Sequence, residues 1–160
     1  MSSVTVRPIT PSDTEFVRGQ LVRHFVSPEI WSRDVPFRAD ALPGFLGEVG
    51  GVPCGHITVH HGERETEVIT LVSERENIGL GHALLSRAIE ESRSRGDWRL
   101  FLTTSNDNLR ALGFYQRRGI RIVAVIPGAI DRSRAREGGI PTHAANGIPI
   151  HDELELEIRF

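Results

Sequence analysis

Residues 73–85, SERENIGLGHALL, carry the chain from the end of an alternating strand into an amphipathic helix. Alternation over 65–72 predicts the strand, and apolar residues at helical spacing over about 79–95 predict the helix. Gly79 and Gly81 stand where the helix begins, and glycine there lets a ligand approach the backbone. The free N–H groups of the first turn and the helix dipole favour an anion, so this turn is a candidate diphosphate site.

The glycine turn by itself has a second interpretation, because a tight turn without any ligand uses the same residues. It is not a dinucleotide-binding fingerprint either. The third glycine and the later acidic residue of that fingerprint are both missing.

The segments before the turn predict a mostly antiparallel front half. A short strand over 4–7 is followed by a helix that starts at Thr10-Pro11-Ser12-Asp13, runs to about His24 and uses Phe16, Leu21 and Phe25 as core contacts. Three prolines indicate irregular structure over 27–43, in which a short helix is the alternative. Three strands joined by tight turns then form a meander, over 45–49, 54–61 and 65–72.

The segments after the turn predict alternating strands and helices. Strands are expected over 98–104 and 120–126, with a helix over 106–118 between them. The last strand, 153–160, is expected to turn its leucines inward and Glu153, Glu155 and Glu157 to solvent. The chain is therefore predicted to be an α/β (α+β) protein with one mixed sheet covered by helices.

Composition limits the classes of function. With 160 residues, 39% of them hydrophobic, the chain fits one domain over 1–160 with a core of its own. A formal net charge of -2 argues against binding nucleic acid or an anionic membrane through bulk charge. The single cysteine, Cys54, fits a reducing compartment, and no apolar run is long enough to span a membrane. We expect a cytoplasmic protein with no nucleic-acid or membrane partner.

A second motif lies in residues 104–120, TSNDNLRALGFYQRRGI. Its Asn108, Ala111, Tyr115 and Gly119 match the spacing Asn-x-x-Ala-x-x-x-Tyr-x-x-x-Gly-Phe, with Ile120 in place of the final Phe. In this motif, and in the glycine turn, the sequence resembles the GNAT superfamily of acyl-CoA-dependent N-acetyltransferases. The resemblance covers most of residues 4–126. It implies a GNAT-type, mostly antiparallel central sheet of about seven strands flanked by about four helices.

One position departs from the family pattern Gln/Arg-x-x-Gly-x-Gly/Ala. Glu76 stands where the family has Gln or Arg, and Arg75 lies one position earlier. A carboxylate beside a diphosphate is unfavourable. Glu76 is therefore expected to weaken the affinity for CoA without changing where CoA binds.

The resemblance implies direct transfer of an acetyl group from acetyl-CoA to an amine, with three groups of residues involved. The cofactor is held at Leu71, Val72, Arg75, Asn77, Ile78, Gly79, Leu80, Gly81, His82 and Asn108. Tyr115 takes the position of the general acid that protonates the leaving thiolate. A carboxylate on the strand before the turn acts as the base, and both Glu65 and Glu67 are candidates because alternate residues share a face.

Several alternatives stay open. Asn108 either orients the cofactor or caps its helix. The acceptor is a small cationic amine or a protein amino group, and the segments over 27–43 and 137–150 are expected to select it. A non-catalytic CoA-binding or sensor domain is a second hypothesis, and a phosphate binder unrelated to CoA is a third. Cys54, His56 and His60 share a strand face, but no metal site is predicted. A homodimer paired through the last strand is also an expectation.

Overall fold

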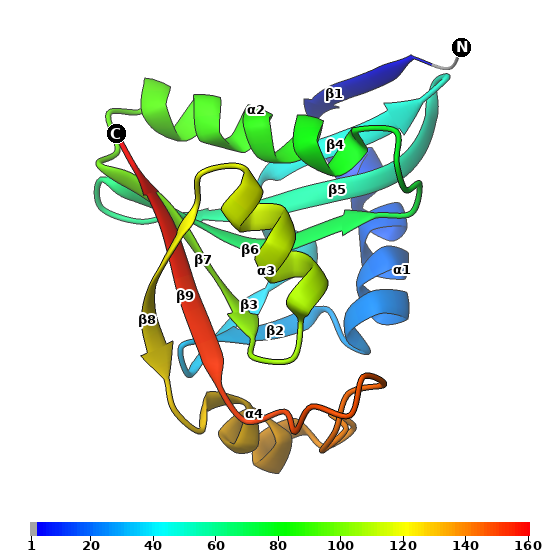
Figure 1. Cartoon of the computed structure of the whole chain (residues 1–160). Coiled ribbons are helices and arrows are strands. Elements are labelled where there is room, and N and C mark those ends of the chain that lie inside the picture. The colour runs from blue at the N-terminus through cyan, green and yellow to red at the C-terminus, as the bar shows by residue number, and fades with distance from the viewer. Residues whose placement is uncertain (1–2) are drawn as a thin grey trace. The chain divides into compact units, whose positions relative to one another are not determined.

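The computed structural model describes residues 3–160, in which seven strands form a mixed, mostly antiparallel sheet accompanied by four α-helices (Figure 1). This confirms the predicted fold class. The chain divides into two compact units, which we describe separately: unit 1 holds the chain up to Ile30, Phe37–Leu100 and Phe160, and unit 2 holds Trp31–Pro36 and Phe101–Arg159. No helix in the described part of the chain is both long and apolar enough to cross a bilayer. The assignment of 1–160 to one domain stays a prediction.

The sheet of unit 1 is the predicted antiparallel meander with one further strand. Each strand pairs with the next in the order β1 (Val4–Pro8), β4 (Gly44–Val49), β5 (Val52–His61) and β6 (Glu65–Ser73). Gly50 and Gly51 join β4 to β5 with φ values of 58° and 80°, a left-handed conformation in which side chains are disfavoured. The Gly-Gly pair is therefore the local signal that made this hairpin predictable.

The first helix begins at the predicted place. A 3-10 turn, Pro11–Asp13, leads into α1 (Thr14–Phe25), and the backbone N–H of Thr10 donates to the Asp13 carboxylate at 2.8 Å. Val17 and Leu21 of α1 are buried in a cluster with Leu46 of β4. Phe25, predicted to be a core contact, is the last residue of α1 and is 40% exposed, so that prediction was wrong.

Two glycines let the second helix approach the sheet closely. Gly47 of β4 and Gly55 of β5 are directly paired, and both lie under the start of α2 (Leu80–Ser94). A Cβ atom on Gly55 would lie 2.6 Å from the carbonyl oxygen of Val72 and 2.9 Å from the side chain of Leu80. Because neither glycine has a side chain, the first turn of α2 can pack closely against the backbone of β4 and β5.

Replacing Gly55 by alanine is expected to lower the free energy of unfolding by about 1–3 kcal/mol, because the added methyl meets a backbone oxygen that cannot move aside. Chemical denaturation measures the change. Gly19→Ala in α1 is the matched control, since nothing lies within 4 Å of its added Cβ. That variant should be neutral or more stable. Equal destabilisation of the two variants would contradict the packing argument.

The segment predicted to be irregular contains a hairpin. β2 (Glu29–Ser32) pairs with β3 (Val35–Arg38), followed by a 3-10 turn, Ala39–Ala41. The tip residues Arg33 and Asp34 have φ values of 50° and 64°, which glycine or asparagine usually signals in a sequence. The prediction was wrong because neither of those residues marks the turn and the neighbouring prolines obscure the strands.

Unit 2 contains the remaining strands and helices. Within it β9 (Glu153–Arg159) lies between β7 (Arg99–Ser105, whose first two residues belong to unit 1) and β8 (Arg121–Ile126). The helices of this unit are α3 (Leu109–Arg117) and α4 (Ala129–Glu137). The last strand is therefore an inner strand, and β8, whose Ile122, Val123 and Val125 are exposed, is the edge.

The glutamates of β9 are not the solvated row that alternation predicted. Glu153 and Glu157 are buried, and only the prediction that Leu156 points inward is confirmed at full burial. Glu153 accepts hydrogen bonds from the backbone N–H of Arg33 at 3.0 Å and from the hydroxyl of Thr103 at 2.9 Å, while Glu157 pairs with Arg159. The hairpin tip covers this face, which the sequence alone did not reveal.

A cluster of ion pairs fastens the hairpin tip to α4. Both Nε and Nη2 of Arg132 donate to the Asp34 carboxylate at 2.9 Å, and Arg136 donates to it at 3.0 Å. The hydrogen bond from Arg132 is the main reason that the pKa of Asp34 falls to about 2. The Arg136 guanidinium also lies 4.3 Å from the centre of the Trp31 ring. Residues 131–137, which belong to α4, thus anchor the hairpin tip.

Candidate active site

The glycine turn has the geometry of an anion site. β6 ends at Ser73 and α2 begins at Leu80, with Gly79 as N-cap at φ 80° and Asn77 at φ 60°. Gly79, the N-cap of α2, has no side chain that could cap the first turn, and no acidic residue lies in that turn. Nothing lies within 4 Å of where a Gly79 Cβ would be. The residues present therefore fit a diphosphate, which the N–H groups of the first turn would bind.

Glu74, the first residue of the turn, forms hydrogen bonds with other parts of unit 1. The backbone N–H of Glu74 donates to the carbonyl of Cys54 at 2.9 Å, and the Glu74 carboxylate accepts from Arg23 of α1 at 2.5 Å. Burial by itself would raise the pKa of Glu74. The hydrogen bond from Arg23 and the other groups around the carboxylate outweigh that effect, so the pKa is lowered. Residues 74–77 are all exposed. Hydrogen bonds thus hold the first residue of a turn whose next three residues also face solvent.

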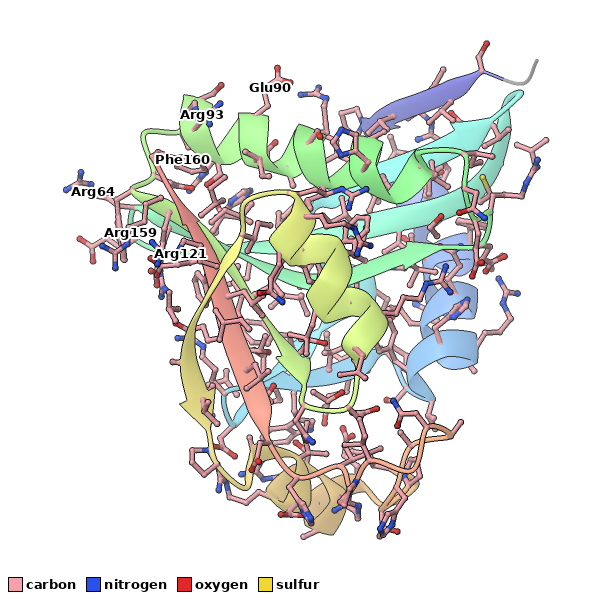
Figure 2. The ribbon with its side chains drawn as sticks, viewed as in Figure 1. Arg64, Glu90, Arg93, Arg121, Arg159 and Phe160 are labelled. Carbon is pink, nitrogen blue, oxygen red and sulfur yellow. The ribbon has the colours of Figure 1, made fainter. Side chains whose placement is uncertain are left out.

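Replacing Glu76 by arginine is expected to tighten CoA binding about fivefold, because the change replaces a repelling charge beside the diphosphate with an attracting one. Calorimetric titration at low salt measures it. Glu90→Arg, which makes the same charge change at an exposed position far along α2 (Figure 2), should leave the affinity unchanged. Unchanged or weaker binding by the Glu76 variant would mean that this side chain points away from the phosphates.

β6, the strand that leads to the turn, contains the backbone predicted to bind the cofactor and both candidate bases. Leu71 and Val72 lie opposite Ile57 and His56 of β5, and Val72 is buried. Glu65 accepts a hydrogen bond from Arg99 at 2.8 Å. Glu67 is 2% exposed and lies opposite His60 in the register. Both carboxylates therefore stay candidates for the base, Glu65 paired with Arg99 and Glu67 buried.

Two histidines of β5, His56 and His60, differ in burial and in the groups that they contact. His56 is fully buried, with Nδ1 2.6 Å from Oε1 of Gln20 and Nε2 2.9 Å from the hydroxyl of Thr70. Burial lowers its pKa to about 4, so the ring is neutral near pH 7. His60 is exposed and contacts the ring of Phe37 at a centroid distance of 5.1 Å. His56 is therefore a structural core histidine and cannot line a solvent-accessible pocket.

Tyr115 and Asn108 lie on α3 in unit 2. Asn108 caps this helix, because its Oδ1 accepts a hydrogen bond from the N–H of Ala111 at 3.2 Å. Tyr115 is 9% exposed and packs edge-on against Phe114 at 5.3 Å. Burial raises its pKa to about 12, so the phenol is neutral near pH 7. A neutral phenol can donate a proton.

The structure distributes the predicted site residues over the two units. Unit 1 brings together the end of β6, the glycine turn and the first turn of α2. Unit 2 carries Tyr115 and Asn108 on one helix. Gln20 and Thr70 were not predicted as partners of His56, because they lie 36 and 14 residues away from it in the sequence. Pairing of a buried histidine with a distant amide leaves no local signal in a single sequence.

Known proteins share both the sequence pattern and the fold. The model of the acetyltransferase (GNAT) family matches residues 13–120. The uncharacterised protein YdhI of Bacillus subtilis is 39% identical over 134 residues, which cover 82% of this chain and 83% of YdhI.

Among solved structures, the IAA acetyltransferase of Bacillus cereus aligns with a TM-score of 0.73 at 18% identity, over 99% of this chain and 100% of its own. A GNAT family acetyltransferase of Elizabethkingia anophelis, with acetyl-CoA bound, aligns with a TM-score of 0.70 at 18% identity, over 98% of each chain. These structures share the fold, and the family match covers more than half of the sequence. The chain therefore belongs to the acetyltransferase (GNAT) family.

Proposed function

We propose that this GNAT acetyltransferase transfers the acetyl group of acetyl-CoA directly to an amine. The first turn of α2, which begins after Gly79 and contains no acidic side chain, is the observation that carries the proposal. The amine nitrogen attacks the thioester carbonyl carbon, a C–N bond forms and the C–S bond breaks. The nitrogen loses one proton to a base, and the departing sulfur gains one from an acid, so the transfer needs no covalent intermediate on the protein.

Acetyl-CoA would be bound by unit 1 along the end of β6 and the glycine turn. Backbone groups at Leu71 and Val72 would pair with the pantetheine arm, and one N–H would polarise the thioester carbonyl. Such a preorganised donor contributes a few kcal/mol when it is aimed at the developing negative charge. The diphosphate would lie at the first turn of α2, at Gly79, Leu80, Gly81 and His82, with Arg75, Asn77 and Ile78 beside it. The Elizabethkingia anophelis relative, solved with acetyl-CoA, supports this ligand.

Two side chains would move the protons. Tyr115 is the proposed acid, and its neutral phenol suits protonation of the leaving thiolate. Glu67 is the proposed base, directly or through a water molecule, because a free amine with a pKa near 10.4 is almost fully protonated at neutral pH. Glu65, which lies on the same strand and pairs with Arg99, is the second candidate. Asn108 would act on the cofactor only with its amide nitrogen, since its oxygen caps α3.

The acceptor is either a small cationic amine or a protein amino group, and we favour the small amine. The net charge of -2 supports a cationic ligand over a polyanionic partner. The hairpin tip and the segment 137–150 are proposed to select the acceptor. A cytoplasmic location fits the single buried cysteine. Homodimerisation is also proposed, with the exposed edge strand β8 replacing β9 as the pairing strand.

Release of free thiol from acetyl-CoA, followed in the presence of a panel of acceptors, tests the function. The panel contains small diamines, amino-acid amides and short peptides with free N-termini. Turnover with at least one class is expected. Saturable acetyl-CoA binding without turnover on any acceptor would favour the alternative, a CoA-binding sensor domain.

A further inference from the structure

A chain of buried polar side chains lies beneath the strand that is proposed to bind the thioester. It runs from Gln20 of α1 through His56 and Thr70 to Thr58, and its successive polar atoms are 2.6, 2.9 and 2.5 Å apart. All four side chains are at most 2% exposed. Buried polar groups are costly unless each has its partner, so this chain calls for an explanation beyond simple packing.

The partners in the chain fix the direction of its hydrogen bonds. The Gln20 oxygen can only accept, so Nδ1 of His56 carries the proton and Nε2 accepts from the hydroxyl of Thr70. The Thr70 oxygen then accepts from the hydroxyl of Thr58. Burial keeps the imidazole neutral, as this arrangement requires. Only a hydroxyl at position 70 can donate to His56 and accept from Thr58 at once.

The same residues lie at a break in the register of β5 and β6. Thr58 lies opposite Thr70, but the next residue, Val59, lies opposite Val68. Ile69 is therefore an extra residue on β6, and its side chain packs against the cluster around Val17 and Leu21. A bulge of this kind bends the strand and re-aims the residues that follow it.

We propose that His56 is a positioning residue, which acts through Thr70 to hold the bulge at Ile69 and so aims the backbone of Leu71 and Val72 at the thioester. The assignment rests on the proposed function of those two residues. Because side chains alternate along a strand, a slip of one residue would move Leu71 and Val72 to the opposite faces of β6. The hydrogen bonds of Thr70 disfavour that slip, since they are made only in the observed register.

Two substitutions at Thr70 separate hydrogen bonding from packing. Thr70→Val keeps the branched shape but removes the hydroxyl, whereas Thr70→Ser keeps the hydroxyl and removes a methyl group. Amide hydrogen exchange over Ile69–Val72 is measured in the protein without ligand. The valine variant should exchange about tenfold faster there, on the scale of a lost buried hydrogen bond, and the serine variant should resemble the wild type. A serine variant that exchanges as fast as the valine variant, or faster, would overturn the proposal, as would unchanged exchange in the valine variant.

Turnover provides a second readout. Thr70→Val should lower kcat by about tenfold to a hundredfold, the scale expected of a small misplacement, with the dissociation constant of acetyl-CoA within about twofold of the wild type. Thr58→Val is the control, because it leaves the bond between His56 and Thr70 intact and should affect kcat less. Unchanged kcat in Thr70→Val would overturn the proposal. If the wild type itself shows no turnover, the proposed function fails, and hydrogen exchange still decides whether Thr70 holds the bulge.

Discussion

Replacing Tyr115 by phenylalanine is expected to lower kcat by about 10²–10⁴, the range that general acid catalysis supplies. The ring and its contact with Phe114 are kept, so the change removes only the O–H group. Burial raises the pKa of this phenol to about 12, which keeps its proton in place at neutral pH. Steady-state kinetics with acetyl-CoA and a working acceptor measure the loss.

The binding of acetyl-CoA by the Tyr115→Phe variant distinguishes catalysis from structure. Its dissociation constant should stay within about twofold of the wild type, because the phenol is needed only when the thiolate leaves. Phe114→Leu is a control for packing on α3, since it disturbs the neighbouring ring and leaves the hydroxyl. A Tyr115→Phe variant with wild-type kcat would show that this residue is a packing aromatic and that the thiolate leaves unprotonated or is protonated by water.

Replacing Glu67 by glutamine is the second large change, with an expected loss in kcat of about 10²–10³ near neutral pH. The amide keeps the size of the side chain and cannot take a proton. The loss should shrink as the pH approaches about 10.4, where the substrate amine becomes neutral without help from the protein. Measuring kcat against pH for both proteins tests this dependence.

Glu65→Gln is the matched control on the same strand. It removes the carboxylate that pairs with Arg99, and a partly exposed pair of this kind contributes little, so kcat should change less than about threefold. The reverse ranking, with Glu65→Gln the slower enzyme, would make Glu65 the base. Equal and small losses in both variants would point to a base elsewhere in the chain or to solvent.

Periodicity and turn chemistry made much of the fold predictable. The meander over β4, β5 and β6 carries alternating side chains and a Gly-Gly turn, and α2 has both an apolar face and a starting glycine. These signals are local, so one sequence is enough to find them. The spacing of Asn108 and Tyr115 likewise predicts one helix, which the structure contains as α3.

The elements that were missed depend on contacts between distant residues. The hairpin tip is held by Asp34 and Arg132, which are 98 positions apart, and Glu153 is buried because the same tip covers it. Alternation in β9 predicts which residues share a face, but it cannot tell that both faces are covered. The candidate site was predictable to the same extent. The glycine turn is a local pattern and was found, whereas the partners of His56 come from α1 and β6 and were not.

Calorimetric titration of the purified protein with acetyl-CoA, beside free CoA and a longer acyl-CoA, decides whether the turn after β6 and the first turn of α2 bind the diphosphate of this substrate. Saturable micromolar binding is predicted, with a preference among the three ligands that identifies the acyl donor. Absence of both heat and thermal stabilisation up to millimolar ligand would contradict binding there. It would mean that Glu76 has disabled the site and that the chain retains only the family's fold.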